Sequence, residues 1–453
     1  MKKFDLIVIG GGAAGMNLVH KAATNGWQTA LVESSHLGGT CINIGCIPSK
    51  TLIYSAKVMK LVAEAESVGV LTAKPRVDWP AMVRRKDRLV ERIRSRSYRT
   101  FEENARITLF EEEAQFTGTH ELFVNGATIT AEKIVIAAGA RTAVPRIPGL
   151  DKVDFLTSTS IMEMAGLPKS LLILGGGIIA LEFSQLFTRL GVEVTILQRD
   201  ERLAPALEPE ISEEIRKILE DEGVKVKTGV RIIAVEKENN RIIAADEKTD
   251  GVVRYSAEKL LVATGRMSNG DRLNLEKAGV ETDERGYIRV NSAFETNVDG
   301  IWAIGDITGG AMFTHRAWHD GMLLGRGMVD GIEISSEGRL IPFAIFTDPE
   351  IAGIGMGEKG AAEAGYKVRV KRFKFGNQGR ALAMEQVNGF VKLVIQEESG
   401  KLLGAHLIGT EAGELIHELI MAIRLGATVY DLQDMMHVHP TISEAIGNAA
   451  RSV

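Results

Sequence analysis

The chain begins with a pattern of apolar and polar positions that is typical of a βαβ unit. Residues Leu6 to Ile9 are uniformly apolar and lead into a glycine turn, an amphipathic segment follows, and a second apolar run ends at Glu33. Far downstream, Ser170 to Asp200 repeat this pattern. Apolar runs bounded by glycine predict buried parallel strands, so the chain is expected to contain two dinucleotide-binding units.

Two further apolar runs lead into glycine turns, and each is predicted to form the strand that closes one nucleotide-binding sheet. They are KIVIAAGA, residues 133–140, and KLLVATGR, residues 259–266. Proline and glycine in RIPGL and GLPKS predict linkers near residues 146 and 166, which places the first domain boundary near residue 147.

The pattern changes after about residue 342. Alternating positions in GFVKLVIQEESGKLLGAHLIG predict two strands joined by a polar turn. A helix is predicted to follow, with an apolar stripe of Leu415, Ile416, Leu419, Ile420 and Ile423. We expect an α+β domain here, in which the stripe is either ordinary core or part of a contact with a second chain.

The composition is that of a soluble globular protein of several domains. The 453 residues carry a formal net charge of -5, and no apolar run reaches the ~18 residues that a membrane span needs. Asp5 and the following glycines mark the start MKKFDLIVIGGG as a strand rather than a secretory signal. The basic run RRKDRLVERIRSRSYR is interpreted as the solvated face of a helix. We therefore expect a cytoplasmic protein with neither a nucleic-acid nor a membrane partner.

Both cysteines of the chain, Cys41 and Cys46, lie in one short segment, GGTCINIGCIPSK. Two thiols are too few for a structural disulfide framework, and a bridge between them would close so small a loop that its entropic stabilisation would be slight. A redox-active pair explains their proximity better. Pro48 predicts that a helix begins near Cys46, where free N–H groups and the helix dipole would stabilise a thiolate.

The first repeat has the glycine spacing of a dinucleotide-binding turn. Gly10, Gly12 and Gly15 fit the pattern G-x-G-x-x-G. Glycine in this pattern permits the tight turn and lets the backbone approach a pyrophosphate at the helix N-terminus. Glu33, at the end of the second strand, is placed to accept hydrogen bonds from ribose hydroxyl groups.

The second repeat differs from the first at the end of its second strand. It keeps Gly175 and Gly177, and Ala180 takes the third glycine position. Gln198 and Arg199 stand where an acid is usual for NAD. A guanidinium binds a 2'-phosphate through charge-assisted hydrogen bonds, whereas a carboxylate would repel it. We therefore expect NADP(H) rather than NAD(H), with an ordinary surface arginine as the alternative interpretation of Arg199.

Two nucleotide sites and one dithiol suggest a relay in which a flavin passes electrons from a nicotinamide to a disulfide. The segment GGTCINIGCIPSK resembles the active-site segment of the FAD-dependent pyridine nucleotide-disulfide oxidoreductases, which include dihydrolipoamide dehydrogenases, glutathione reductases and mercuric reductases. IWAIGDITGG is similar to the second FAD motif of this family, and HVHPTISEA is similar to its C-terminal active-site motif. The resemblance covers essentially the whole chain.

The resemblance implies roles for individual residues. Cys46 would face the flavin, and Cys41 would exchange with the substrate. Lys50 would lie near flavin N5 and pair with Glu182. The residues implied in binding the cofactors FAD and NADP(H) are Gly10, Gly12, Ala14, Gly15, Glu33, Gly39, Thr40, Gly139, Gly175, Gly177, Ile178, Gln198, Arg199, Gly265, Arg266, Gly305, Asp306, Thr314 and His315. No metal site is expected.

The same resemblance implies an α/β fold with two Rossmann-like dinucleotide-binding domains and a C-terminal α+β dimerisation domain. The expected domains are an FAD-binding domain in two parts, residues 1–147 and 267–340, an NAD(P)-binding domain, 148–266, and a dimerisation domain, 341–453. The partner would be a second copy of the chain. His439, oriented by Glu444, would act as a base at the cysteines and FAD of the other chain in a shared active site.

Different segments point to different members of the family. FTDPEIAGIG and GAHLIGTEAGELI look most like dihydrolipoamide dehydrogenase, whereas LQRDERL resembles the NADPH-using mercuric reductases. Mercuric chemistry itself is disfavoured, because those enzymes use a second cysteine pair that this sequence lacks. We therefore expect an oxidoreductase that acts on a small-molecule or protein-bound disulfide. The alternatives are a mercuric-reductase-like NADPH oxidoreductase, a subunit that serves mainly as a component of a multienzyme complex, and a flavin oxidase.

Overall fold

The computed structural model describes residues 2–248 and 251–452. Its first unit is built on a five-stranded parallel sheet in the order β18-β8-β2-β3-β4. The strands are β18 (Ile301–Ala303), β8 (Ile134–Ile136), β2 (Leu6–Ile9), β3 (Thr29–Val32) and β4 (Ile107–Phe110). Every residue of β2 is buried, as its central place in the sheet requires.

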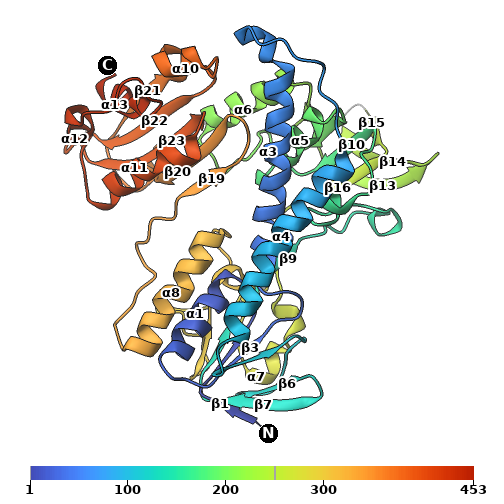
Figure 1. The fold of residues 1–453 in the computed structure, drawn as a ribbon, viewed down its shortest axis with the longest axis vertical. Helices are drawn as coiled ribbons and strands as arrows, with labels where there is room; N and C mark the ends of the chain where they lie inside the picture. The colour runs from blue at the N-terminus through green and yellow to red at the C-terminus, as the bar shows by residue number, and fades with distance from the viewer. Residues whose placement is uncertain (1, 249–250, 453) are drawn as a thin grey trace.

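The prediction for residues 133–140 was right about the strand and wrong about its place in the sheet. β8 pairs on both sides, and β18 closes the sheet instead. β18 is only three residues long, which is too short for its periodicity to mark it as a strand. Helices α1 (Ala13–Thr24) and α8 (Thr314–Asp330) pack side by side over this unit (Figure 1). Both parts of the expected FAD-binding domain, residues 1–147 and 267–340, therefore contribute strands to the same sheet.

The second unit contains a four-stranded parallel sheet in the order β12-β11-β10-β16. Its strands are β12 (Lys225–Lys227), β11 (Glu193–Leu197), β10 (Ser170–Leu174) and β16 (Lys259–Val262), with helices α5 (Ile178–Arg189) and α6 (Pro209–Asp221). β16 lies at the edge of the sheet, as the sequence predicts. A separate antiparallel sheet consists of β13 (Ile232–Glu238), β14 (Arg241–Lys248) and β15 (Gly251–Ala257).

The third unit contains a five-stranded antiparallel sheet in the order β19-β20-β23-β22-β21. Its strands are β19 (Phe343–Ile345), β20 (Glu350–Gly355), β23 (Leu402–Gly409), β22 (Phe390–Gln396) and β21 (Val368–Lys374). Helix α11 (Ala412–Arg424) packs on this sheet and carries the predicted apolar stripe. Ile416, Leu419 and Ile423 are buried in the core of this unit, and Leu415 and Ile420 pack partly buried against it. The stripe is therefore largely core, and only Leu415 and Ile420 keep partly exposed surface.

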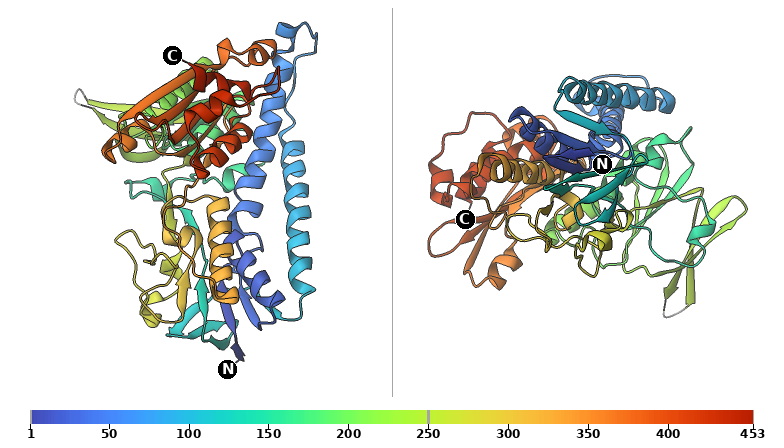
Figure 2. Two further views of the ribbon diagram at one scale, coloured as in Figure 1. Left: turned by 90° about the vertical axis from the view of Figure 1, so that its left-hand side faces the viewer. Right: turned by 90° about the horizontal axis from the view of Figure 1, so that it is seen from below.

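Two long helices, α3 (Cys46–Ala63) and α4 (Trp79–Glu102), run side by side along the molecule (Figure 2). α3 also packs against α5, so it connects the first unit to the second. α4 is the basic helix that the sequence predicts, and Asp78 caps it by accepting a hydrogen bond from the Ala81 N–H at 2.9 Å. Within the described residues, no helix combines the length and the apolar composition that crossing a membrane requires.

The remaining elements are short. Residues 2–9 form two strands in different sheets, because Asp5 interrupts the run and accepts a hydrogen bond from the Gln28 N–H at 2.7 Å. The other short strands are β1 (Lys2–Phe4), β5 (Gln115–Gly118), β6 (Glu121–Val124), β7 (Ala127–Ala131), β9 (Ala140–Thr142) and β17 (Arg266–Ser268). The short helices are α2 (Gly39–Asn43), α7 (Leu275–Ala278), α9 (Glu358–Glu363), α10 (Gly379–Ala383), α12 (Val429–Asp434) and α13 (Glu444–Arg451).

Candidate active site

The two cysteines lie in consecutive helices, and both are half-buried free thiols. Cys41 is in α2, and Cys46 is the first residue of the 18-residue helix α3, as the sequence predicts. The N-cap residue of α3 is Gly45, which offers no side-chain acceptor to the first N–H groups. These N–H groups and the helix dipole favour a negative charge at the position of Cys46.

The surroundings of the two thiols distinguish them chemically. A hydrogen bond from Cys41 lowers the pKa of Cys46 to about 6, helped by Thr314 and by the positive charge of Lys50 and opposed by burial. The hydrogen bond to Cys46, together with burial, raises the pKa of Cys41. Thr314 Oγ1 lies 3.4 Å from Cys46 Sγ, although the sequence implied only a cofactor-binding role for this threonine. In the reduced pair, these surroundings favour the thiolate on Cys46 and the proton on Cys41.

An ion pair connects the cysteine helix to the second nucleotide unit. Lys50 Nζ donates to Glu182 Oε2 at 2.8 Å and to Glu182 Oε1 at 3.0 Å. Lys50 is one turn after Cys46 on α3, and Glu182 is in α5 with its side chain only 4% exposed. The structure thus brings together the two residues that the resemblance pairs.

The histidine and the acid of the C-terminal motif also form a pair. His439 Nδ1 lies 2.9 Å from Glu444 Oε1, so Nε2 is the ring nitrogen left for proton transfer. A hydrogen bond from the Thr441 N–H, followed by one from His439, lowers the pKa of Glu444. The His439 side chain is 79% exposed, and within residues 2–248 and 251–452 no hydrogen bond or ion pair connects it to Cys41 or Cys46.

A buried glutamine supports this pair and was not found from the sequence. Gln378 is 3% exposed, and its Nε2 donates to the Thr441 carbonyl and lies 3.4 Å from Glu444 Oε2. Its Oε1 accepts a hydrogen bond from the Ala381 N–H at 2.7 Å, which fixes the amide orientation. Because Gln378 is more than sixty residues from the motif, no local pattern indicates the contact.

The two glycine turns fit a bound dinucleotide. Gly12 and Gly177 are the N-cap residues of α1 and α5, and both have extended backbone conformations. A Cβ atom on either would meet no protein atom within 4 Å, so packing of the protein does not explain the glycines. A diphosphate lying against the free N–H groups of each helix does explain them. FAD held at the first turn would supply electron transfer between a nicotinamide coenzyme and a disulfide.

Glu33 lies beside the first turn, where the sequence places it. Its Oε2 accepts a hydrogen bond from the Gly11 N–H at 2.7 Å, and its Oε1 accepts one from the Ser35 N–H at 2.8 Å. Burial raises the pKa of this carboxyl, and the two backbone hydrogen bonds oppose the increase. Each oxygen keeps a lone pair that can accept a ribose hydroxyl.

Asp306 lies in a short 3₁₀ helix, Gly305–Thr308, directly after β18. Burial raises the pKa of its carboxyl, while Arg266, at 4.0 Å, opposes the increase. The turn is held by Asp320, a fully buried residue whose Oδ2 accepts a hydrogen bond from the Gly305 N–H at 3.1 Å. Asp320 was not found from the sequence, because its partner is in a different element.

The other residues implied in cofactor binding lie around these turns. Gly39 approaches the first turn so closely that a Cβ on it would lie 2.9 Å from Gly12 Cα. His315 is in the first turn of α8, and its Nε2 lies 2.7 Å from the Pro342 carbonyl oxygen. The remaining ones are in helix starts or in turns that follow strands: Gly10, Ala14, Gly15, Thr40, Gly139, Gly175, Ile178 and Gly265.

The end of β11 carries the residues expected to select the coenzyme. Arg199 is exposed, and within the described parts of the chain no ion pair includes it. Gln198 is buried, and its Nε2 donates to Asp200 Oδ2 at 2.9 Å and to the Arg202 carbonyl at 3.3 Å. The glutamine amide therefore holds the loop in place.

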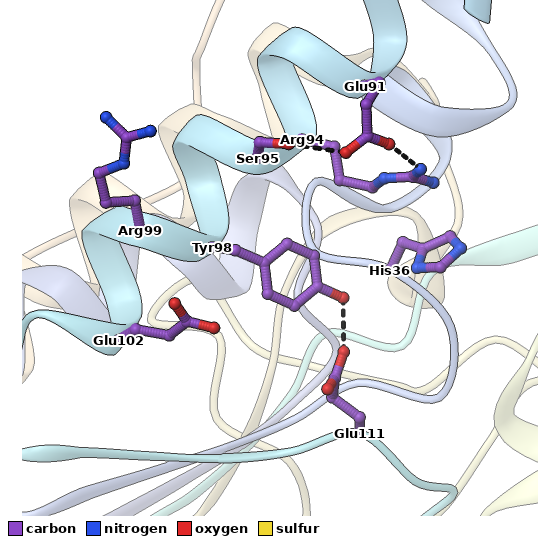
Figure 3. Close-up of a pocket in the computed structure, with 8 residues that line it drawn as sticks. All are labelled: His36, Glu91, Arg94, Ser95, Tyr98, Arg99, Glu102 and Glu111. Atoms are coloured by element: carbon purple, nitrogen blue, oxygen red, sulfur yellow. Dashed lines mark hydrogen bonds and ion pairs between the residues drawn. The ribbon is translucent and has the colours of Figure 1, made fainter.

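An open pocket of about 480 Å³ lies beside the loop that follows Glu33 (Figure 3). Tyr98 donates to Glu111 Oε1 at 2.6 Å across this pocket, and Glu91 pairs with Arg94. Burial, followed by the hydrogen bond to Glu111, raises the pKa of Tyr98 to about 12. Neither cysteine lines the pocket, so it is separate from the dithiol.

Comparisons with known proteins agree with this geometry. Residues 4–321 match the pyridine nucleotide-disulphide oxidoreductase family, and residues 341–450 match its dimerisation domain. A mercuric reductase from Lysinibacillus sphaericus is 35% identical, over 99% of this chain and 82% of its own length. A dihydrolipoyl dehydrogenase from Thermus scotoductus is 36% identical, over 100% of this chain and 98% of its own length.

A solved structure shows the same fold. The HOCl-induced flavoprotein disulfide reductase RclA from Escherichia coli, in a Cu(II) complex, is 30% identical with a TM-score of 0.91, over 99% of each chain. The family is FAD-dependent and uses NAD(P)H, which fits the two glycine turns described above. The chain therefore belongs to the pyridine nucleotide-disulphide oxidoreductases and is a flavin-dependent oxidoreductase of the kind represented by mercuric reductases, dihydrolipoyl dehydrogenases and flavoprotein disulfide reductases.

Proposed function

We propose that the protein reduces a disulfide substrate with electrons from NADPH, which pass through FAD to a Cys41–Cys46 disulfide. The observation that supports this most strongly is the contrast between the two thiols. Cys46 carries a stabilised thiolate next to Lys50 and Thr314, and Cys41 keeps its proton. One thiol is suited to contact the cofactor as an anion, and the other is suited to exchange with a substrate.

The exchange balances as follows. Two electrons and one proton convert the Cys41–Cys46 disulfide to the Cys41 thiol and the Cys46 thiolate. Cys41 then transfers its proton to Nε2 of His439, and its sulfur attacks the substrate disulfide, which releases one substrate thiolate. His439 returns the proton to that thiolate. The Cys46 thiolate attacks the Cys41 sulfur of the mixed disulfide, releases the second substrate thiolate and restores the original disulfide.

The active site is proposed to be shared between the two chains of a homodimer. The family match to a dimerisation domain supports a dimer. The exposure of His439 and the lack of a described contact with the cysteines support a base that acts on the other chain. The same proposal includes the domain limits given above, the cofactor-binding residues and a cytoplasmic location.

Arg199 should determine the preference for NADPH. Losing a hydrogen bond to a charged group costs roughly 1.5 to 3 kcal/mol, or about 10- to 150-fold. The Arg199→Ala variant should therefore lose this factor in kcat/KM for NADPH and keep its kcat/KM for NADH. Arg216→Ala, which removes an arginine that pairs with Glu220 on α6, serves as the control and should leave both values unchanged. Equal losses with both coenzymes would contradict the assignment.

Replacing each of the two N-cap glycines with valine should weaken the binding of one cofactor and leave the other bound. Gly12→Val is expected to weaken FAD binding by tenfold or more, about 1.4 kcal/mol, because the side chain occupies the diphosphate position. Gly177→Val is expected to keep FAD and to raise the KM for NADPH at least tenfold. Flavin absorbance per chain and coenzyme kinetics measure these effects. Loss of flavin from both variants, or from neither, would show that the turns are assigned wrongly.

A panel of substrates tests the proposal as a whole. Lipoamide, glutathione disulfide, protein disulfides, Hg(II) and Cu(II) are each assayed with NADPH and with NADH. We expect NADPH-dependent reduction of a disulfide that is lost in Cys41→Ser. Reduction of Hg(II) alone would favour the mercuric-reductase-like alternative, for which the 35% identical relative is the specific observation. Turnover of a disulfide only within a copurifying assembly would favour a subunit of a multienzyme complex.

A further inference from the structure

The segment between β19 and β20 is attached to the face of α5 that carries Glu182. The Phe346 N–H donates to Glu182 Oε1 at 3.0 Å. Three residues along α5, Gln185 donates to the Asp348 carbonyl at 2.8 Å and accepts from the Asp348 N–H at 2.7 Å. Arg189 adds an ion pair to Asp348 at 2.9 Å. Since these three residues of α5 share one face, the segment is fixed over two turns of the helix.

The ring of Phe346 contacts the other partner of the ion pair. Lys50 Nζ lies 4.8 Å from the ring centroid while it donates to both oxygens of Glu182. An ammonium over an aromatic face is attracted by the quadrupole of the ring. Phe346 is 37% exposed and the Lys50 side chain is 30% exposed, so the ring shields one side of the ammonium from water. The ammonium therefore lies between a buried carboxylate and an aromatic ring that comes from the third unit of the chain.

We propose that Phe346 is a positioning residue: its ring holds the Lys50 ammonium against Glu182 and, through Lys50, stabilises the thiolate of Cys46. Lys50 and Cys46 are four residues apart on α3, so they share a face of this helix. The positive charge of Lys50 lowers the pKa of Cys46, while Glu182 raises it. Without the ring, the ammonium gains water and its attraction for the thiolate is screened more strongly. Only one part of this proposal rests on the proposed function, namely that the Cys46 thiolate takes part in disulfide reduction.

The test measures the reactivity of Cys46 directly. In the FAD-loaded Cys41→Ser chain, Cys46 is the only cysteine, so its alkylation by iodoacetamide against pH reports its thiolate fraction. Adding Phe346→Leu keeps the backbone N–H and removes the aromatic face. The midpoint of alkylation should move upward by roughly half to one pH unit, so that the rate near pH 6 falls roughly 2- to 5-fold. Phe346→Tyr keeps an aromatic face and should restore the original profile.

The control variants separate positioning from a general packing effect. Phe343→Leu removes an aromatic ring in β19, three residues before Phe346, which stacks on Phe313 at a centroid distance of 6.5 Å, and it should leave the midpoint unchanged. Lys50→Met should raise the midpoint, and Phe346→Leu should add nothing in that background, because the ring acts through the ammonium. The proposal would be overturned if the midpoint shifts of Lys50→Met and Phe346→Leu add fully in the double variant. It would also be overturned if Phe346→Leu leaves the alkylation profile unchanged, or if Phe343→Leu shifts the midpoint by the same amount.

This experiment is independent of the proposed turnover, because alkylation of the FAD-loaded chain needs neither a nicotinamide coenzyme nor a disulfide substrate. If the protein reduces no disulfide but the profiles shift as expected, the positioning role stands and the proposed function fails. If disulfides are reduced and the profiles do not shift, the positioning role alone fails. Flavin content per chain, measured for each variant, identifies any variant that does not fold.

Discussion

Replacing Cys41 with serine should reduce disulfide turnover by about 10³-fold or more, because the covalent route through this sulfur is removed. FAD should stay bound, since Cys41 is not part of either glycine turn. Cys46 should remain largely a thiolate, because the serine hydroxyl replaces Cys41 as hydrogen-bond donor and Thr314 and Lys50 are unchanged. Assays with the best substrate of the panel, at matched flavin content, measure the loss.

Cys41→Ala is the matched comparison, because it also removes the donor that contributes most to the low pKa of Cys46. The pKa of Cys46 is lowered from the ordinary thiol value of about 8.5. Losing a hydrogen bond that favours the charged form therefore raises the pKa of Cys46 above 6, and the alkylation midpoint moves to higher pH. Both variants should be inactive, but only Cys41→Ala should show this shift. If Cys41→Ser keeps turnover, another group attacks the substrate and the assignment of Cys41 is wrong.

The sequence predicted the features that depend on neighbouring residues. The start of α3 at Cys46 follows from the proline two positions later, and the pairing of His439 with Glu444 lies within one short motif. The glycine turns after β2 and β10 follow from apolar runs that end in glycine. Each of these features is specified by the order of residues over a few turns of chain.

The features that the sequence did not predict depend on which distant elements meet. Thr314 contacts Cys46 across 268 positions, and Phe346 contacts Glu182 across 164. Periodicity tells which face of a helix is buried but not which side chain of another unit lies against it. The stripe on α11 shows the same limit: its apolar spacing suits either a core or a dimer contact, and only the packing of the third unit shows that Ile416, Leu419 and Ile423 are core.

Mixing two inactive variants should restore activity if the active site is shared. Cys46→Ser removes the thiolate from one chain, and His439→Ala removes the base from the other. Removing a general base costs about 10²- to 10⁴-fold, so each homodimer alone should have almost no activity. Random exchange of equal amounts gives half mixed dimers, and in a two-fold dimer one of the two sites in each is intact at both positions. Activity should therefore rise to about a quarter of the normal value.

The geometry gives this experiment a clear alternative outcome. His439 is paired with Glu444 and highly exposed, and within the described residues no hydrogen bond or ion pair connects it to a cysteine of its own chain. If the base acts within its own chain, each mixed dimer contains one chain without Cys46 and one without His439, and no intact site can form. Differently tagged chains that copurify show that mixed dimers are present. With that shown, activity that stays at the level of the separate variants would exclude a shared site, whereas recovery to about a quarter assigns Cys41, Cys46 and FAD to one chain and His439 with Glu444 to the other.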